Sequence, residues 1–257
     1  MNGKIIKGLA ASAALLLGTA SASADAAPVR NIVLVHGAWV NGNGWKPVYD
    51  ILVKDGYRVS IAEHPLTSFA DDVTAVRRIV DVQDGPTILV GHSYGGALIT
   101  DVGNDTKVAG LVYIAAHALD QGETEVANGK RYPSETSKTT DIKKTADGFL
   151  YLDPAKYAAD FAADLPPAQA RFEANAQELT AASVFSTPAG QPAWKSKPTW
   201  YAVATADRII NPGLERMYAR RAHAHTIEIQ GASHSVYESR PKEVAALIEQ
   251  AAMHSAP

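Results

Sequence analysis

The segment Gly91–Gly96, with the sequence GHSYGG, constrains the fold of this chain more than any other part of it. An apolar run, Thr87–Val90, precedes it and Ala97–Ile99 follows it, which predicts a buried strand before the segment and a helix after it. The pattern Gly-x-Ser-x-Gly between a strand and a helix is typical of a sharp turn, the nucleophile elbow, in which only glycine fits beside the serine. Such a turn exposes the serine hydroxyl at the end of the strand. The sequence therefore predicts that Ser93 is a nucleophile.

Strands and helices are expected to alternate along most of the remaining chain. Short apolar, β-branched runs predict strands, and apolar residues at helical spacing predict helices. The predicted strands are 31–35, 57–62, 87–90, 108–115, 199–204 and 226–230, and the predicted helices are 47–54, 68–82, 95–102, 213–222 and 241–251. This alternation predicts an α/β fold with a mostly parallel central sheet and helices on both of its faces. With 257 residues, one elaborated domain is favoured over two independent ones.

Residues 120–197 interrupt the alternation. They contain a polar stretch at 134–144 and two helical patterns, which begin after Asp153-Pro154 and Pro166-Pro167. We interpret this segment as a small helical lid inserted into a core formed by residues 25–119 and 198–257. The lid aromatic side chains expected to shape a mainly apolar pocket are Phe149, Tyr151, Tyr157, Phe161 and Phe172.

Residues 1–24 have the composition of a secretory signal peptide. Lys4 and Lys7 precede the apolar run Gly8–Gly18, and small residues follow up to Ala24. A positively charged start, an apolar centre and a small-residue cleavage site define such peptides. The apolar run is shorter than the roughly 20 residues that a membrane-spanning helix needs. We therefore expect cleavage before Asp25 and a periplasmic or secreted mature protein.

The charge of the chain argues against nucleic acid and anionic membranes as main partners. The formal net charge is −3, and removal of Lys4 and Lys7 with the signal peptide makes it −5. No membrane association is expected after cleavage, and the sequence leaves the oligomeric state open. The chain has no cysteine, so an exported protein of this sequence has no disulfide bonds.

A serine becomes a useful nucleophile only when a base removes its proton. His234 follows the last predicted strand, where a loop would bring an imidazole towards the serine, and Asp207 follows the preceding strand. The order serine, aspartate, histidine along the chain is the one expected for a triad behind a nucleophile elbow. Asp120 is the alternative carboxylate, but a loop-capping role is favoured for it. We predict a triad of Ser93, Asp207 and His234.

Further site residues are predicted from the ends of other strands. The loop after the first strand, His36–Trp39, is placed to direct a backbone N–H at a developing oxyanion, and the amide after the nucleophile supplies a second donor. These donors are the amides of Ala38 and Tyr94. Trp39 and His117 are candidate substrate-binding residues, with structural roles an equal alternative for each. His36 is expected to be structural.

Together these residues resemble the α/β-hydrolase superfamily, and most of all its branch of bacterial esterases, plant methylesterases and plant hydroxynitrile lyases. The resembling segments are His36–Trp39 with Gly44-Trp45, Gly91–Gly96, Tyr113–Ala116, Asp207 and His234. The resemblance implies an ester hydrolase without a cofactor or metal. Ser235 stands where the hydroxynitrile lyases of this branch carry a lysine, so lyase activity is disfavoured.

The predicted function is hydrolysis of carboxylic esters of small, largely apolar molecules through an acyl-enzyme. Two alternatives remain open from the sequence. The same triad would serve a lactonase, an amidase or a cofactor-free perhydrolase, and a fold of this kind can also serve as a ligand-binding protein without catalysis. The identity of the acyl and alcohol groups is not encoded in any motif of the chain.

Overall fold

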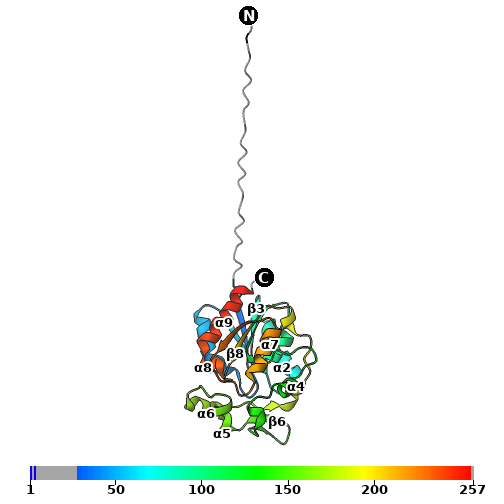
Figure 1. Ribbon diagram of the computed structural model, residues 1–257, viewed down its shortest axis with the longest axis vertical. Helices are drawn as coiled ribbons and strands as arrows, with labels where there is room; N and C mark the ends of the chain where they lie inside the picture. The colour runs from blue at the N-terminus through cyan, green and yellow to red at the C-terminus, as the bar shows by residue number, and fades with distance from the viewer. Residues whose placement is uncertain (2, 4–27, 256–257) are drawn as a thin grey trace.

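A sheet of six strands lies at the centre of the computed structural model, which describes residues 1, 3 and 28–255 (Figure 1). The strands are β1 (Asn31–Val35), β2 (Arg58–Ala62), β3 (Thr87–Ser93), β4 (Val108–Ala116), β8 (Thr199–Ala204) and β9 (His225–Ile229). Their order across the sheet is β2-β1-β3-β4-β8-β9, and every neighbouring pair is parallel. The strand that carries Ser93 is an inner one, buried along its whole length, which explains its continuous apolar run.

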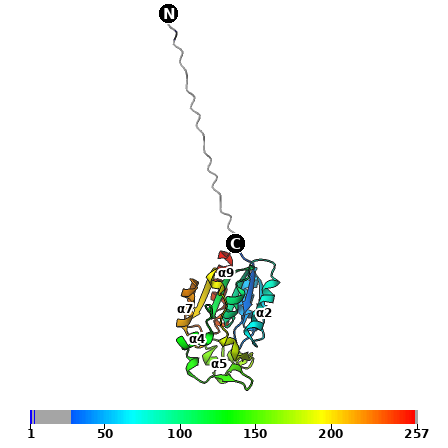
Figure 2. The ribbon, with the colours of Figure 1, turned by 90° about the vertical axis from the view of Figure 1, so that its right-hand side faces the viewer.

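Helices cover both faces of this sheet (Figures 1 and 2). Apolar side chains of α1 (Lys46–Lys54), α8 (Val236–Ser239) and α9 (Pro241–His254) pack against one face. Those of α2 (Phe69–Asp81), α3 (Gly95–Val102) and α7 (Pro212–Arg221) pack against the other. The predicted α/β fold, with a mostly parallel sheet between two helical layers, is thus confirmed.

Most predicted boundaries agree with the structure to within a few residues, and β3 shows the instructive difference. The sequence predicts that this strand ends at Val90, but it continues to Ser93. His92 pairs with Ile114 and Ser93 with Ala116 on β4. Backbone groups form these pairings, so they need no apolar side chains, and the apolar pattern alone therefore ended the strand too early.

The chain between β4 and β8 leaves the central sheet and forms its own small layer. It contains α4 (Glu125–Arg131), α5 (Pro154–Asp160), α6 (Pro167–Asn175) and an antiparallel sheet of β5 (Ile142–Lys144), β6 (Phe149–Leu152) and β7 (Thr180–Ala181). Short 3-10 helices lie at 42–45, 136–138, 182–186 and 193–195. The layer lies at the end of the molecule opposite the carboxyl end of α9 (Figure 1). Here we refer to residues 120–197 as the lid segment.

The lid segment is attached to the core beside the predicted site. The amide of Glu178 donates to the carbonyl oxygen of Trp39 at 3.2 Å, and the amide of Trp39 donates to the hydroxyl of Thr180 at 3.1 Å. The amide of Ser235, next to His234, donates to the carbonyl oxygen of Phe161 at 3.0 Å. The lid segment therefore meets both the loop after β1 and the loop after β9.

The predicted signal peptide falls, apart from residues 1 and 3, outside the described residues. Among the helices that the described residues form, none has both the length and the apolar character needed to cross a membrane.

Candidate active site

The turn at Ser93 has the strained geometry that the glycine pattern predicts. Ser93 has a φ of 53°, a left-handed conformation that is uncommon for residues other than glycine. A Cβ atom at Gly91 would lie 2.6 Å from the carbonyl oxygen of Gly95, and one at Gly95 would lie 2.5 Å from that of His36. Any side chain at these two positions would displace backbone. The serine is therefore held at the carboxyl end of β3 by packing around it.

Asp207 and His234 are in direct contact. Asp207 follows β8 and His234 follows β9, and both side chains are buried. The Nδ1 atom of His234 lies 2.5 Å from Oδ2 of Asp207. The other carboxylate oxygen, Oδ1, accepts the amides of Ile209 at 2.7 Å and Ile210 at 2.9 Å, which fixes the orientation of the carboxylate. With a carboxylate at Nδ1, neutral His234 carries its proton there and presents Nε2 as the basic atom.

The Nε2 atom of His234 has no hydrogen-bond partner among residues 28–255, and the Ser93 hydroxyl forms no bond to it in the rotamer seen. Catalytic hydrogen bonds of this kind often tighten only when substrate is bound.

The buried side chain of His92 links β3, the strand that ends at Ser93, to the loop that carries His234. The Nε2 atom of His92 lies 3.0 Å from the carbonyl oxygen of His234, and burial holds the pKa of His92 well below its ordinary value. His92 is fully buried next to the turn.

The loop after β1 lies directly against Ser93. A Cβ atom at Gly37 would lie 2.7 Å from Cβ of Ser93, so this loop approaches as closely as a backbone without a side chain allows. Ala38, the next residue, is buried, and so is Tyr94 at the start of α3. The structure thus brings the loop that contains Ala38 against Ser93, and Tyr94 follows Ser93 directly in the chain.

A buried polar network connects the loop after β1 with Tyr94 at the start of α3. The ring of His64 stacks on that of His36 at 3.9 Å, and its Nε2 lies 3.1 Å from the carbonyl oxygen of His36. The hydroxyl of Tyr94 donates to Oδ2 of Asp72 at 2.8 Å, and Asp72 also lies 3.5 Å from Nδ1 of His64. Burial lowers the pKa of His64 and raises that of Tyr94, so both are neutral near pH 7. His36 is thus buried within this network, as a structural role for it requires.

Two cavities lie beside the site, and Trp39 lines both of them. The larger has a volume of about 640 Å³, within the range of small-molecule sites, and His117 is in its wall. Both candidate substrate-binding residues are thus cavity-lining residues.

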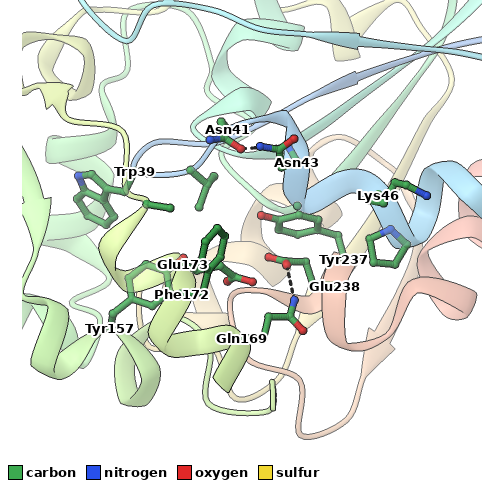
Figure 3. Close-up of a pocket in the computed structure, with 14 residues that line it drawn as sticks. Trp39, Asn41, Asn43, Lys46, Tyr157, Gln169, Phe172, Glu173, Tyr237 and Glu238 are labelled. Atoms are coloured by element: carbon green, nitrogen blue, oxygen red, sulfur yellow. Dashed lines mark hydrogen bonds between the residues drawn. The ribbon is translucent and has the colours of Figure 1, made fainter. Parts of the chain in front are cut away.

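The smaller cavity has a volume of about 320 Å³ and is shown in Figure 3. Tyr157 and Phe172 of the lid segment line it, and the amide of Gln169 donates to Oε2 of Glu238 at 2.9 Å. Burial, followed by the neighbouring Glu173 carboxylate, raises the pKa of Glu238. Of the five lid aromatic side chains expected to shape a pocket, only these two line either cavity, and the apolar wall of the larger one comes instead from residues such as Ile142, Leu150 and Phe185.

Two buried carboxyl groups near the site have no counterpart in the sequence predictions. Glu215 of α7 accepts the amide of Ala204 at 3.1 Å and interacts with Asp207, and burial together with Asp207 raises its pKa. Glu125 of α4 lines the larger cavity. Both look like ordinary helical acids in the sequence, because burial depends on neighbours that are distant along the chain.

Asp120, the alternative carboxylate, pairs with Lys195, while Asp207 occupies the contact with His234. No group of three or more His, Asp or Glu side chains within the described residues is arranged to hold a metal ion.

Comparison with known proteins identifies the family of the chain. The sequence model of the alpha/beta hydrolase family matches residues 32–247, and the chain belongs to this family. A carbendazim hydrolyzing esterase from Nocardioides sp. (strain SG-4G) is 35% identical over 122 residues, which are 42% of this chain and 50% of the esterase. The matched part thus spans half or less of the length of the curated relatives.

Solved structures show the same fold over most of the chain. A pyrethroid hydrolase from Sphingobium faniae JZ-2 has a TM-score of 0.73 at 24% identity, covering 88% of this chain and 98% of the hydrolase. A methylesterase from Arabidopsis has a TM-score of 0.72 at 16% identity, covering 87% and 98%. Bacterial ester hydrolases and plant methylesterases are therefore among its structural neighbours, as the sequence motifs indicate.

Proposed function

We propose that the protein hydrolyses carboxylic esters through an acyl-enzyme formed on Ser93. The observation that carries this proposal is the 2.5 Å contact between Asp207 and His234, which orients the imidazole and leaves its Nε2 without a partner among the described residues. The carbonyl oxygen of His234 lies 3.0 Å from Nε2 of His92, the residue before the strained Ser93. The esterases and hydrolases among its relatives support the same reaction class.

The reaction would proceed in two halves. Ser93 attacks the ester carbonyl while Nε2 of His234 takes its proton, and Asp207 stabilises the imidazolium. The amides of Ala38 and Tyr94 donate to the oxyanion of the tetrahedral intermediate, an interaction worth about 3–4 kcal/mol per donor in related chemistry. His234 then protonates the leaving alcohol. In the second half it activates the water that releases the acid from Ser93.

The substrates would be esters of small, largely apolar molecules. The larger cavity supports this, since its volume of about 640 Å³ suits a small organic molecule and apolar side chains line most of it. Carbendazim and pyrethroids, which appear in the names of the relatives, belong in a substrate panel beside simple alkyl, aryl and cyclic esters. We also infer that the chain is exported after removal of residues 1–24.

A fluorophosphonate probe and the substrate panel test the proposal together. We expect stoichiometric labelling of Ser93 and hydrolysis of one or more esters. Ser93→Ala should abolish both, whereas Ser186→Ala, at an exposed serine of the lid segment, should change neither. Asp207→Asn should lower kcat by about 10⁴ because the wrong tautomer of His234 is favoured. Wild-type esterase activity in Ser93→Ala, or no labelling of the folded wild-type protein, would exclude the mechanism.

A further inference from the structure

The walls of the larger cavity are formed by immediate neighbours of the proposed catalytic groups. Trp39 follows Ala38, and the amide of His117 donates to the carbonyl oxygen of Ser93 at 3.1 Å. Ile209 also lines the cavity, and its amide donates to Asp207. A substrate bound at Ser93 would therefore extend its non-reacting part into this space.

One acid lies in the wall of this otherwise largely apolar cavity. Glu125, the first residue of α4, has a side chain that is only 7% exposed. Its Oε2 lies 3.3 Å from Nε2 of His117, and its Oε1 has no hydrogen-bond partner among the described residues. Burial raises the pKa of Glu125 well above its ordinary value, which favours the protonated, uncharged carboxyl group.

A chain of hydrogen bonds determines where the protons of this pair lie. Nδ2 of Asn128 donates to Oε2 of Glu123 at 2.9 Å and to the hydroxyl of Tyr218 at 3.0 Å. Although burial opposes ionisation of Glu123, its hydrogen bonds, above all that from Arg221, lower its pKa to about 2, so this carboxylate only accepts. The Asn128 amide nitrogen must therefore face it. Tyr218 accepts from that nitrogen and directs its own proton elsewhere.

The Tyr218 proton has an acceptor in Nδ1 of His117, 3.3 Å away. Burial, with a smaller contribution from His234, lowers the pKa of His117 to about 3, so the imidazole is neutral. A neutral imidazole that accepts at Nδ1 carries its proton on Nε2 and donates from there towards Glu125. The carboxyl proton of Glu125 is then left without an acceptor among the described residues. An unsatisfied buried donor is unfavourable, which favours a ligand that supplies the acceptor.

We propose that Glu125, held in place by His117, forms a subsite that donates a hydrogen bond from its carboxyl group to a neutral acceptor oxygen, such as an ether or carbonyl oxygen, in the non-reacting part of the ester. This proposal rests on the proposed esterase function and adds a substrate class to it. The preferred substrates are then apolar esters with one oxygen at a fixed distance from the scissile carbonyl. The buried carboxyl would select against chains that are apolar throughout, because they leave its proton unpaired.

Two series of linear esters test the subsite, one varied in the acyl chain and one in the alcohol chain. In each series an ether oxygen replaces one methylene at successive positions, and the all-methylene ester of equal length is the reference. We expect wild-type kcat/KM to be raised about tenfold at one position, as one additional satisfied hydrogen bond would produce. Equal kcat/KM for oxygen and methylene at every position in both series would overturn the proposal without any variant.

Two substitutions of similar size identify the group responsible. Glu125→Gln keeps an N–H donor and an acceptor and should retain the preference within about threefold. Glu125→Met has no donor and should lose the preference, so that the oxygen-containing and the all-methylene esters have equal kcat/KM. If the preference persists in Glu125→Met, the subsite lies elsewhere. If it disappears in Glu125→Gln, a hydrogen-bond donor at this position does not produce the preference, and the proposal is wrong.

Binding of non-hydrolysable ketone analogues of the two series, measured by calorimetry, separates this proposal from the esterase proposal. If no ester is hydrolysed, only the proposed esterase function is contradicted. The ratio of the Kd values for the oxygen-containing ketone and the all-methylene ketone of equal length would still report on the subsite. A tenfold tighter Kd for the oxygen-containing ketone supports the subsite. Equal Kd values overturn it, whatever the activity.

Discussion

At the scale of single residues, the glycines around Ser93 determine the shape of the site because no side chain fits at their positions. Gly91 and Gly95 leave no space for a side chain, and Ser93 adopts a left-handed conformation between them. The cost of that strain, about 1–3 kcal/mol, must be met by the packing around the turn. The motif could be recognised in the sequence for this reason, since the same steric constraint dictates both its residues and its geometry.

Gly37 provides the sharpest test at this scale. Gly37→Ala places a methyl group 2.7 Å from Cβ of Ser93 and 3.2 Å from the carbonyl oxygen of His92, so the loop that carries Ala38 must move. We expect kcat to fall about 100-fold, because a shift of about 1 Å in a catalytic group costs that much. Steady-state kinetics on the best ester of the panel measure the effect.

Gly85→Ala is the matched control, since its added methyl would lie 3.7 Å from the Asn31 side chain, an ordinary contact. It should keep wild-type kcat. Unchanged kcat in Gly37→Ala would show that the loop after β1 does not need its close approach to Ser93.

The residues of the proposed triad were predictable one by one because each lies at the end of a strand or in the loop after it, in the chain order expected for this fold. The supporting residues were not. Asp72, Glu215 and Glu125 are buried by elements that come together only in the folded chain, and in the sequence each resembles a solvent-exposed helical acid. Burial, rather than residue type, gives these carboxyl groups their chemistry.

At the scale of elements, the lid segment is joined to the core through polar contacts that apolar periodicity does not reveal. Thr180 on β7 accepts the amide of Trp39, and Glu178 pairs with the same residue through the backbone. Neither α4 nor the antiparallel sheet of the lid segment was predicted. Residues 134–144 are polar, and β5 has only three residues, so no hydrophobic pattern of either period could develop.

The contact between α6 and α8 makes stability depend on pH. Glu238 on α8 lies beside Glu173 on α6, and burial raises its pKa above the ordinary value of 4.5. The folded state therefore holds a proton that the unfolded chain releases near pH 4.5. The stabilisation is complete below that pH and is lost as pH rises through the higher folded pKa. Glu238→Gln mimics the neutral form, so its Tm should exceed that of the wild type at pH 8.5 and equal it at pH 4.5.

Thermal unfolding of both proteins at the two pH values checks this prediction. Glu243→Gln, at an exposed acid of α9, should give the same Tm difference from the wild type at both pH values. If the Tm of Glu238→Gln differs from the wild-type Tm by the same amount at both pH values, Glu238 is ionised in the folded protein.

For the whole molecule, the alternation of short apolar runs and helical patterns was sufficient to predict the architecture. A parallel sheet buried on both faces leaves continuous apolar strands, and β1, β3, β4 and β8 all have them. The position of the larger cavity was not predictable. Its walls consist of residues that follow core strands and of lid residues between α4 and the 3-10 helix at 182–186. These residues are distant along the chain, so no local sequence pattern indicates that they line one cavity.

Export is the prediction that concerns the chain as a whole. The amide of Val29 donates to the carbonyl oxygen of Ala252 at 2.8 Å, and β1 begins at Asn31, so the described core starts only after the expected cleavage site before Asp25. Removal of residues 1–24 should therefore leave the Tm and kcat/KM of the core unchanged. When the full sequence is expressed in a Gram-negative host, the protein should be found in the periplasm or the medium. Its intact mass should be that of a chain whose first residue is Asp25. Replacing Ala22 and Ala24 with bulky residues should block this cleavage. If the wild-type protein instead stays in the cytoplasmic fraction and keeps residues 1–24, the segment is not a signal peptide.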